Sequence, residues 1–253
     1  MSRMKKNSMK FKGAFSGRNV SLCLGFVVVL SLCFTAYTLR DDAELFPVNE
    51  LELNSQFENV DRTNLIEVIA TEINRGFYGL DLDDIKLKLL AIPWVYNVAV
   101  TRRWPDKLSI TVAEQQAVAR WANGGLINIY GNIFHPSQAS YPKNIPLIMG
   151  QPGEQKELLL QYREMSKLLE VLNLSIAWLE KDKRYSIKLG LDHGTSLLLG
   201  RKNEVQRLKR FVEAYKKPLN QKNKRMHSVD LRYANGFAVQ WATRANEGAS
   251  DGV

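Results

Sequence analysis

The sequence of 253 residues is poor in the side chains that build metal centres and disulfide frameworks. Its two cysteines, Cys23 and Cys33, both lie in one apolar stretch, so the rest of the chain must be stabilised by its own core. Within one helix they would be about 15 Å apart, which excludes a bridge between them. The three histidines, His135, His193 and His227, show no ligand spacing, so we expect no metal site.

Catalytic motifs are also missing. The sequence contains no G-x-S-x-G, no phosphate-cradling loop and no dinucleotide fingerprint. Ser140-Tyr141-Pro142-Lys143 has the S-x-x-K spacing of penicillin-binding enzymes, but such a serine opens a helix, whereas this one lies in a proline-rich loop and no K-T-G follows. Acid pairs such as Asp83-Asp84 fit a helix N-terminus. We therefore expect a protein that is not an enzyme and has no cofactor.

Long hydrophobic runs are absent except at residues 20–39, which contain no charged side chain. Twenty helical residues span about 30 Å, the thickness of the hydrocarbon core of a bilayer, so this stretch predicts a transmembrane helix. Basic residues precede it without any acid, and acids follow it. The positive-inside rule then places a basic tail, 1–19, in the cytoplasm and the remainder outside. A cleaved signal peptide is the alternative, but its apolar core is normally only about 7–15 residues long.

The net charge of +9 is unevenly distributed. The basic tail supplies six positive charges, residues 40–199 carry a net −4, and residues 200–253 carry 12 basic and 5 acidic side chains, a net +7. The exported part as a whole therefore has no nucleic-acid signature. Its last 54 residues, 200–253, form a basic module suited to an acidic partner.

The first half of the exported part predicts a small α+β domain. A half-buried strand with Leu51 and Leu53 on one face is followed by a helix capped by Asp61 or Thr63 and by a second helix that begins at Asp81. The stretch 92–112 then reads as a β-hairpin around a Trp-Pro-Asp-Lys turn. Its inward face is expected to hold Trp94, Tyr96, Val98, Val100, Leu108, Ile110 and Val112. Its two tryptophans, Trp94 and Trp104, are expected in the core and at its rim rather than against bases.

The second half predicts another α+β domain. A strand pair at 126–134 and a proline-punctuated loop lead to a helix at about 154–173. The patterns next predict strands at about 174–180, 184–191 and 195–200, a basic amphipathic helix, and final strands at about 227–233 and 237–241. We expect an antiparallel sheet with exposed terminal strands, followed by a disordered tail at 242–253.

The succession of strand, two helices and two strands, with PWV, RRWP and L-S-I-T-V-A-E, resembles the POTRA domain of the FtsQ/DivIB cell-division family. The resemblance continues through ARW, LINIYGNIF, IPLIMGQPG, LLLGR, RLKRFVEAY and VDLRY…VQW, with departures at Ala117 and Ile187. It implies a POTRA domain at 45–121 and an FtsQ-type β domain at 122–241.

The resemblance also implies a function. Family members are scaffolds of the divisome in the bacterial inner membrane, with a cytoplasmic N-terminus and a periplasmic domain at the septum. They link early and late division proteins by holding the membrane-anchored coiled-coil proteins FtsB and FtsL on their last strands. Transferred to matching positions, the contact surface comprises Arg184, Arg232, Tyr233, Asn235, Gly236 and Trp241.

Alternatives stay open at this point. In one alternative, Tyr233 and Trp241 only close the core, and the basic helix is a solvated face. A POTRA surface near the membrane is implied for other division components; Arg102, Arg103 and Lys107 would serve it, or form a solvated turn. An envelope protein that docks or chaperones exported polypeptides, a membrane-anchored regulator and an exported hydrolase are rival classes, and we expect no nucleic-acid partner.

Overall fold

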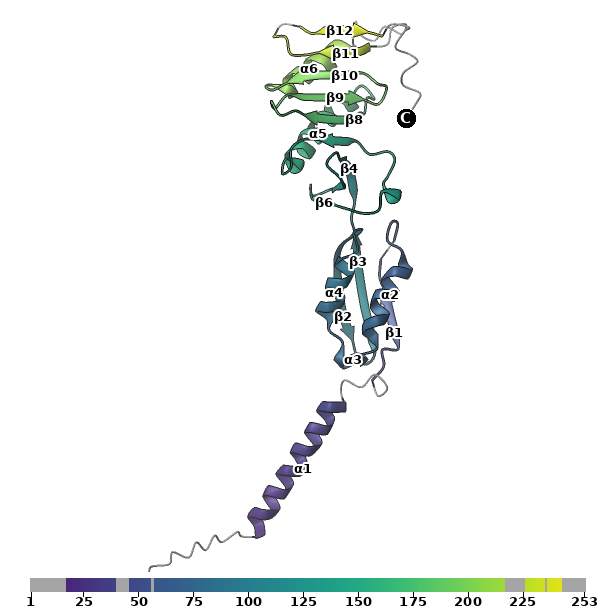
Figure 1. Ribbon diagram of the computed structural model, residues 1–253, viewed down its shortest axis with the longest axis vertical. Coiled ribbons are helices and arrows are strands. Elements are labelled where there is room, and N and C mark those ends of the chain that lie inside the picture. Colours follow the sequence, from purple (N-terminus) through teal and green to yellow (C-terminus); the bar gives the residue numbers. More distant parts are fainter. Residues whose placement is uncertain (1–16, 40–45, 56, 217–225, 235, 243–253) are drawn as a thin grey trace, which may run out of the picture. The chain divides into compact units, whose positions relative to one another are not determined.

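A computed structural model of the chain describes residues 17–39, 46–55, 57–216, 226–234 and 236–242 (Figure 1). The chain divides into two compact units. The first unit comprises residues up to 56, 61–89 and 98–112, and the second comprises 57–60, 90–97 and 113 onwards. Each unit has its own sheet.

Helix α1 (Gly17–Leu39) covers the apolar stretch. Where its side chains are described, large apolar groups such as Leu24, Phe26 and Phe34 are exposed. Within the described residues, no helix combines the length and the apolarity required to cross a bilayer. The transmembrane span at 20–39 therefore stays a prediction, and most of the tail 1–19 lies outside the described residues.

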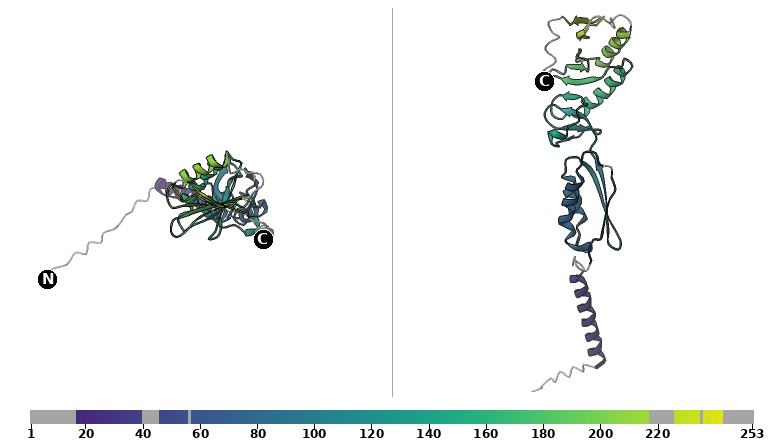
Figure 2. Two further views of the ribbon diagram at one scale, coloured as in Figure 1. Left: turned by 90° about the horizontal axis from the view of Figure 1, so that it is seen from above. Right: turned by 90° about the vertical axis from the view of Figure 1, so that its right-hand side faces the viewer.

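The first unit has the predicted order of strand, helices and two strands. It consists of β1 (Glu50–Leu53), α2 (Arg62–Ile73), a short α3 (Gly76–Gly79), α4 (Leu82–Leu90), β2 (Val95–Arg103) and β3 (Lys107–Glu114). Its three-stranded sheet has the order β1-β3-β2, and β1 runs parallel to β3 with Glu50 opposite Lys107. Figure 2 shows α2 and α4 on one face of this sheet.

The helices of the first unit begin where the sequence predicts. The carboxylate of Asp61 accepts a hydrogen bond from the Thr63 amide at 2.8 Å, and Asp81 accepts from the amides of Asp83 and Asp84 at 3.0 and 3.1 Å. The apolar stripes of both helices pack on the sheet. The resulting core contains the fully buried residues Leu65, Ile69, Ile85, Leu89, Leu108 and Ile110.

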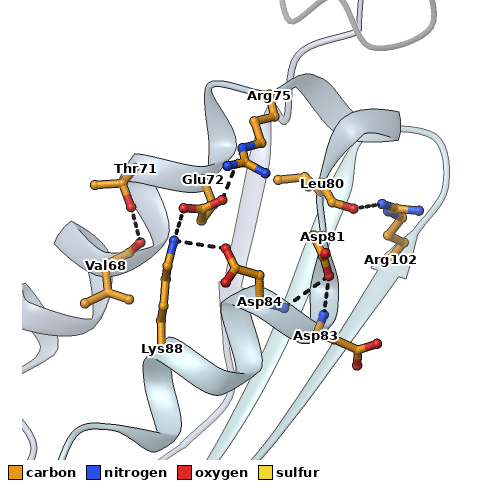
Figure 3. Close-up of polar contacts among 10 residues, drawn as sticks. All are labelled: Val68, Thr71, Glu72, Arg75, Leu80, Asp81, Asp83, Asp84, Lys88 and Arg102. Atoms are coloured by element: carbon orange, nitrogen blue, oxygen red, sulfur yellow. Dashed lines mark hydrogen bonds and ion pairs between the residues drawn. The ribbon is translucent and has the colours of Figure 1, made fainter.

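A buried carboxylate ties α2 to α4. Glu72 is only 3% exposed, and the Lys88 amine donates to its Oε1 atom and pairs with Asp84 at 2.9 Å (Figure 3). Arg75 approaches the second Glu72 oxygen at 3.4 Å. The hydrogen bond to Glu72, followed by that to Asp84, raises the pKa of the Lys88 amine. Sequence periodicity would place the Glu72 side chain in solvent. In the structure it is buried, and Lys88 and Arg75 compensate its charge.

The second unit is built on a nine-stranded sheet in the order β12-β11-β10-β9-β8-β7-β4-β5-β6. Its strands are β4 (Ala117–Trp121), β5 (Leu126–Asn128), β6 (Ile133–Phe134), β7 (Leu147–Met149), β8 (Ile176–Lys181), β9 (Ile187–Leu191), β10 (Ser196–Gly200), β11 (Met226–Asp230) and β12 (Ala238–Trp241). Its helices are α5 (Gln155–Glu170) and α6 (Glu204–Ala214), with a 3₁₀ turn at Gln138–Ser140.

This sheet is mixed, so the prediction of an antiparallel sheet is wrong. Strands β7 and β8 run parallel, as do β10 and β11, and β4 and β7. The physical reason is the position of the helices. Because α5 lies between β7 and β8 in the chain and α6 lies between β10 and β11, each helix carries the chain back so that the next strand runs in the same direction.

The core of the second unit lies between this sheet and its two helices, which Figure 2 shows on one face. Leu158, Leu159, Met165 and Leu169 of α5 and Leu208 and Phe211 of α6 are buried. They pack against buried strand residues that include Ile148, Leu179, Leu189, Leu197 and Val229. The apolar faces of both helices thus pack on the sheet.

The opening of β2 departs from the predicted alternation. Trp94 and Val95 are both buried, whereas Tyr96, expected in the core, is 39% exposed and stacks on Tyr130 with ring centroids 4.8 Å apart. The Trp94 ring nitrogen donates to Ser140 at 2.9 Å. Residues 94 and 96 and the partners of both rings belong to the second unit, and the predicted alternation is lost at this point.

Candidate functional site

Strand β12 is the terminal strand of the large sheet. Among the described residues it pairs with β11 alone, antiparallel, with Val229 opposite Val239 and Asp230 opposite Ala238 (Figure 1). One side of its backbone is therefore without a partner strand in the described part of the chain. Such an edge can accept the backbone hydrogen bonds of an added strand.

The loop that leads into β12 presents two of the residues singled out from the sequence. Arg232 is exposed, and the Tyr233 side chain is 58% exposed. The guanidinium of Arg210, on α6, donates to the carbonyl oxygens of Ala234 at 2.5 Å and Tyr233 at 3.2 Å, so the helix holds this loop. Asn235 lies outside the described residues.

Gly236 and Trp241 have different surroundings. A Cβ atom added at Gly236 would meet nothing within 4 Å, so the backbone there is open to close approach. Trp241 is half-buried and packs against the core, as does Val239. The side chain of Trp241 thus contributes to the core, and its remaining surface lies on the edge strand.

Arg184 and Arg232, far apart in the sequence, line one cleft of about 540 Å³. The cleft lies between the β8–β9 turn, the end of β10 and the first turn of α6. Its other lining residues are Asp182, Ser186, Gly200, Arg201, Lys202 and Arg207. We call this the basic cleft, because five cations face a single lining carboxylate.

Two carboxylates order the walls of the basic cleft. Asp182 accepts from the amides of Arg184 and Ser186, each at 2.8 Å, and the Ser186 amide, followed by the Arg184 amide, lowers the Asp182 pKa. Asp230 pairs with Arg232 at 2.6 Å, and the side-chain hydrogen bond from Arg232 holds the Asp230 pKa below its usual value. Both acids therefore stay charged at neutral pH.

Gly200 allows the cleft to form. Its φ of +81° lies in the left-handed region, which side chains with a Cβ disfavour. An added Cβ would also lie 2.6 Å from Nη1 of Arg207 and 3.2 Å from Cγ of Arg232. Two arginines can therefore approach each other over this glycine only because it lacks a side chain.

Sequence reasoning missed Arg201, Lys202 and Arg207 as members of this site. The signal was present as the net +7 of residues 200–253, but charge alone does not say which basic residues meet. Their convergence depends on the crossover through α6, which brings Arg207 beside the end of β10, where its guanidinium donates to the Leu199 carbonyl at 2.5 Å.

The basic tip of the first unit is engaged within its own fold. Arg102 donates to the carbonyl oxygen of Leu80 (Figure 3). It also donates to the carbonyl oxygen of Tyr78 at 3.4 Å. Lys107 pairs with Glu50 at 2.6 Å, and Arg103 lies 4.0 Å from Glu52. The hydrogen bond to Glu50 raises the pKa of Lys107. The tip therefore carries little uncompensated charge.

The groups considered for chemistry lie apart. Ser140 accepts from Trp94 and donates to the Ser137 carbonyl at 2.7 Å, so its hydroxyl is already used. His193 lies beside Asp192 at 3.2 Å, and His227 is on β11. Within the residues that the structure describes, no group of three or more His, Cys, Asp or Glu side chains is placed to hold a metal ion.

Comparison with known proteins identifies both units. Residues 46–115 match the model of the POTRA domain, FtsQ-type, and residues 119–232 match that of cell division protein FtsQ/DivIB, C-terminal. The chain is 32% identical over 218 residues to cell division protein FtsQ of Coxiella burnetii, covering 86% of this chain and 89% of the relative. It is 30% identical over 239 residues to the FtsQ of Allochromatium vinosum, covering 92% and 93%. The chain therefore belongs to the FtsQ family of cell-division proteins.

Proposed function

We propose that this protein is a non-catalytic scaffold of the divisome that binds FtsB and FtsL through the edge strand β12 and the adjoining basic cleft. In this proposal residues 20–39 anchor it in the inner membrane with its N-terminus in the cytoplasm. Its two units then lie in the periplasm at the septum. By holding both coiled-coil proteins it links early and late division proteins.

The observation that carries the proposal is the juxtaposition of an unpartnered strand edge with a surplus of cations. The β12 backbone offers hydrogen-bonding groups to an added strand, and Arg232 lies in the loop that leads into this strand. Arg184, in the β8–β9 turn, lines the same cleft as Arg232 and is a forked donor for carboxylates. An extended segment with acidic side chains satisfies both features at once. Membrane-anchored coiled-coil proteins with such a segment are the expected partners.

The anchor is supported by the absence of charge in residues 20–39 and by the exposure of apolar side chains along the described part of α1. Protease added to spheroplasts should digest the two units and spare a cytosolic control. A fluorescent fusion should form a band at mid-cell. Protection of the units from protease would contradict this topology.

Tyr233→Ala tests the edge, because this side chain is exposed and its removal leaves the core intact. Aromatic interface anchors commonly account for about 2 kcal/mol or more, so capture of FtsB should fall by at least about tenfold. Tyr130→Ala is the matched control, since Tyr130 is similarly exposed and lies near β6, at the opposite end of the sheet. Equal capture by both variants would contradict the proposed edge.

Trp241→Ala addresses the remaining alternative, in which Trp241 only closes the core. We expect loss of FtsB capture with an unchanged far-ultraviolet circular dichroism spectrum. Loss of both binding and folded signal would assign Trp241 to the core alone, in agreement with its half-buried position.

A further inference from the structure

Four aromatic rings gather at one end of the first unit. Phe46 contacts Tyr78 with centroids 4.8 Å apart, and Trp104 contacts Phe77 at 5.2 Å and Tyr78 at 5.3 Å, all edge to face. Phe77 is buried at the base of the group, whereas Trp104 is 65% exposed. We call Phe46, Tyr78 and Trp104 the aromatic patch. An indole this exposed in an ordered cluster indicates contact with something beyond the fold.

The aromatic patch is held by the backbone around it. The Phe77 amide donates to the Phe46 carbonyl at 2.8 Å. The guanidinium of Arg102 lies 6.0 Å from the centre of the Phe77 ring. It also donates to the Leu80 carbonyl (Figure 3). Trp104 is therefore presented on a fixed platform, so little conformational entropy is lost when it binds.

The topology places this patch where the chain enters the first unit. Glu50 of β1 pairs with Lys107, and the Asn49 amide donates to the Asp106 carbonyl at 3.1 Å, so the turn that carries Trp104 lies beside the start of β1. Only six residues, 40–45, lie between Leu39, the end of α1, and Phe46. The seven Cα–Cα steps from Leu39 to Phe46 reach at most about 25 Å.

We propose that the aromatic patch docks on the headgroup–acyl boundary of the bilayer in which residues 20–39 are anchored. This inference rests on the proposed membrane anchor. Trp and Tyr favour that boundary because their rings are apolar and their N–H and O–H groups are polar. The short tether keeps the patch beside the lipid at high effective concentration, which an independent protein partner lacks.

Charge has a minor part in this contact. Lys107 and Arg103 face Glu50 and Glu52, and Asp106 is held by Asn49 at 2.8 Å, so positive and negative groups are balanced around the patch. The driving force is then the transfer of aromatic surface from water to the headgroup–acyl boundary. We therefore expect docking to depend weakly on the fraction of anionic lipid.

The test uses the full chain in nanodiscs of phosphatidylethanolamine and phosphatidylglycerol, with or without a lipid that carries a nitroxide on its headgroup. The difference in tryptophan fluorescence between the unchanged chain and Trp104→Phe isolates the signal of Trp104. The phenyl ring in this variant preserves the packing. If Trp104 sits at headgroup level, the nitroxide should quench about half or more of that signal. Trp121→Phe is the matched control, because Trp121 is buried in the second unit and should be quenched far less.

Each result decides between the two proposals. Resistance of the chain to alkaline carbonate extraction with Trp104 quenched supports both. Resistance without quenching overturns the docking and leaves the anchor standing, whereas release by carbonate overturns the anchor and the docking together. If Trp104 is not quenched and the Trp104→Ala variant no longer captures a division protein, the patch is assigned to a protein partner instead. This result would also overturn lipid docking.

Discussion

The two units use their basic side chains differently. In the first unit Lys88 pairs with Glu72 and Asp84, Lys107 pairs with Glu50, and Arg102 donates to backbone carbonyls. In the second unit the basic cleft gathers five cations, and among the described residues only Arg232 of these forms an ion pair, with Asp230. The first unit compensates its charge internally, and the second leaves a surplus at its surface.

This difference indicates which forces each unit offers to a partner. The surplus of cations in the basic cleft attracts an acidic chain and orients it. An aromatic patch with balanced charge offers transfer of apolar surface instead. The predictions below test this contrast between the units, beginning with the largest expected effect.

Replacing Gly200 with alanine should disrupt the basic cleft most strongly. The left-handed backbone at this position costs an alanine about 1–2 kcal/mol, and crowding against Arg207 and Arg232 adds about 1–3 kcal/mol. The total loss in free energy of unfolding should be about 3 kcal/mol. Urea unfolding of the full chain in detergent, followed by near-ultraviolet circular dichroism, measures it.

Gly153→Ala separates backbone strain from crowding. Gly153 has a φ of +95°, but an added Cβ there would meet nothing within 4 Å. This variant should therefore lose only the first contribution, about 1–2 kcal/mol. If both variants lose the same amount, crowding by the two arginines is not a constraint on the cleft.

Charge reversal compares the cation surplus of the second unit directly with the balanced tip of the first. Arg184→Glu should lower the affinity for an FtsB segment at least about tenfold at low salt, because a like charge then faces the acidic partner. Arg103→Glu, at an exposed guanidinium 4.0 Å from Glu52, should change it less than about twofold. Isothermal titration calorimetry measures both, and equal effects would remove the distinction between the units.

Local sequence signals predicted most of the elements of both units. Asp61 and Asp81 cap the helices that follow them, and the apolar stripes of α5 and α6 face the core as expected. The direction of the strands was missed, because alternation reports which face a strand buries and not which neighbour it pairs with. Tyr96 was placed wrongly for a similar reason: its partner, Tyr130, lies in a distant turn.

The candidate site was predictable only in part. The family resemblance supplied Arg184 and Arg232, and the structure brings both to one cleft. Arg207 was not predicted, since its contribution depends on a glycine with positive φ and on the crossover of α6. The burial of Glu72 and its pairing with the more exposed Lys88 were missed as well, because each residue alone reads as a solvated helix position.

The smallest expected effect concerns pH and the second unit. Lys181, whose side chain is 9% exposed, pairs with Glu154 at 2.9 Å and with Glu157 at 3.1 Å. The hydrogen bond from Lys181 lowers the pKa of Glu154 from its ordinary 4.5. A lowered pKa stabilises the fold above pH 4.5, and this contribution disappears as the pH falls through the folded-state value.

The melting temperature of the full chain in detergent should therefore decrease below that pH. In Glu154→Gln this decrease should be smaller. The variant should also lower the melting temperature at pH 7 by a few degrees, which corresponds to about 1 kcal/mol of unfolding free energy. Glu180→Gln is the matched control, because Glu180 lies 4.0 Å from Lys188 in a more exposed pair of the same unit. It should leave the acid limb unchanged, since exposed pairs contribute little. An identical acid limb in the unchanged chain and in Glu154→Gln would show that the Lys181 pair does not stabilise the second unit, and that α5 is held to β8 by its apolar face alone.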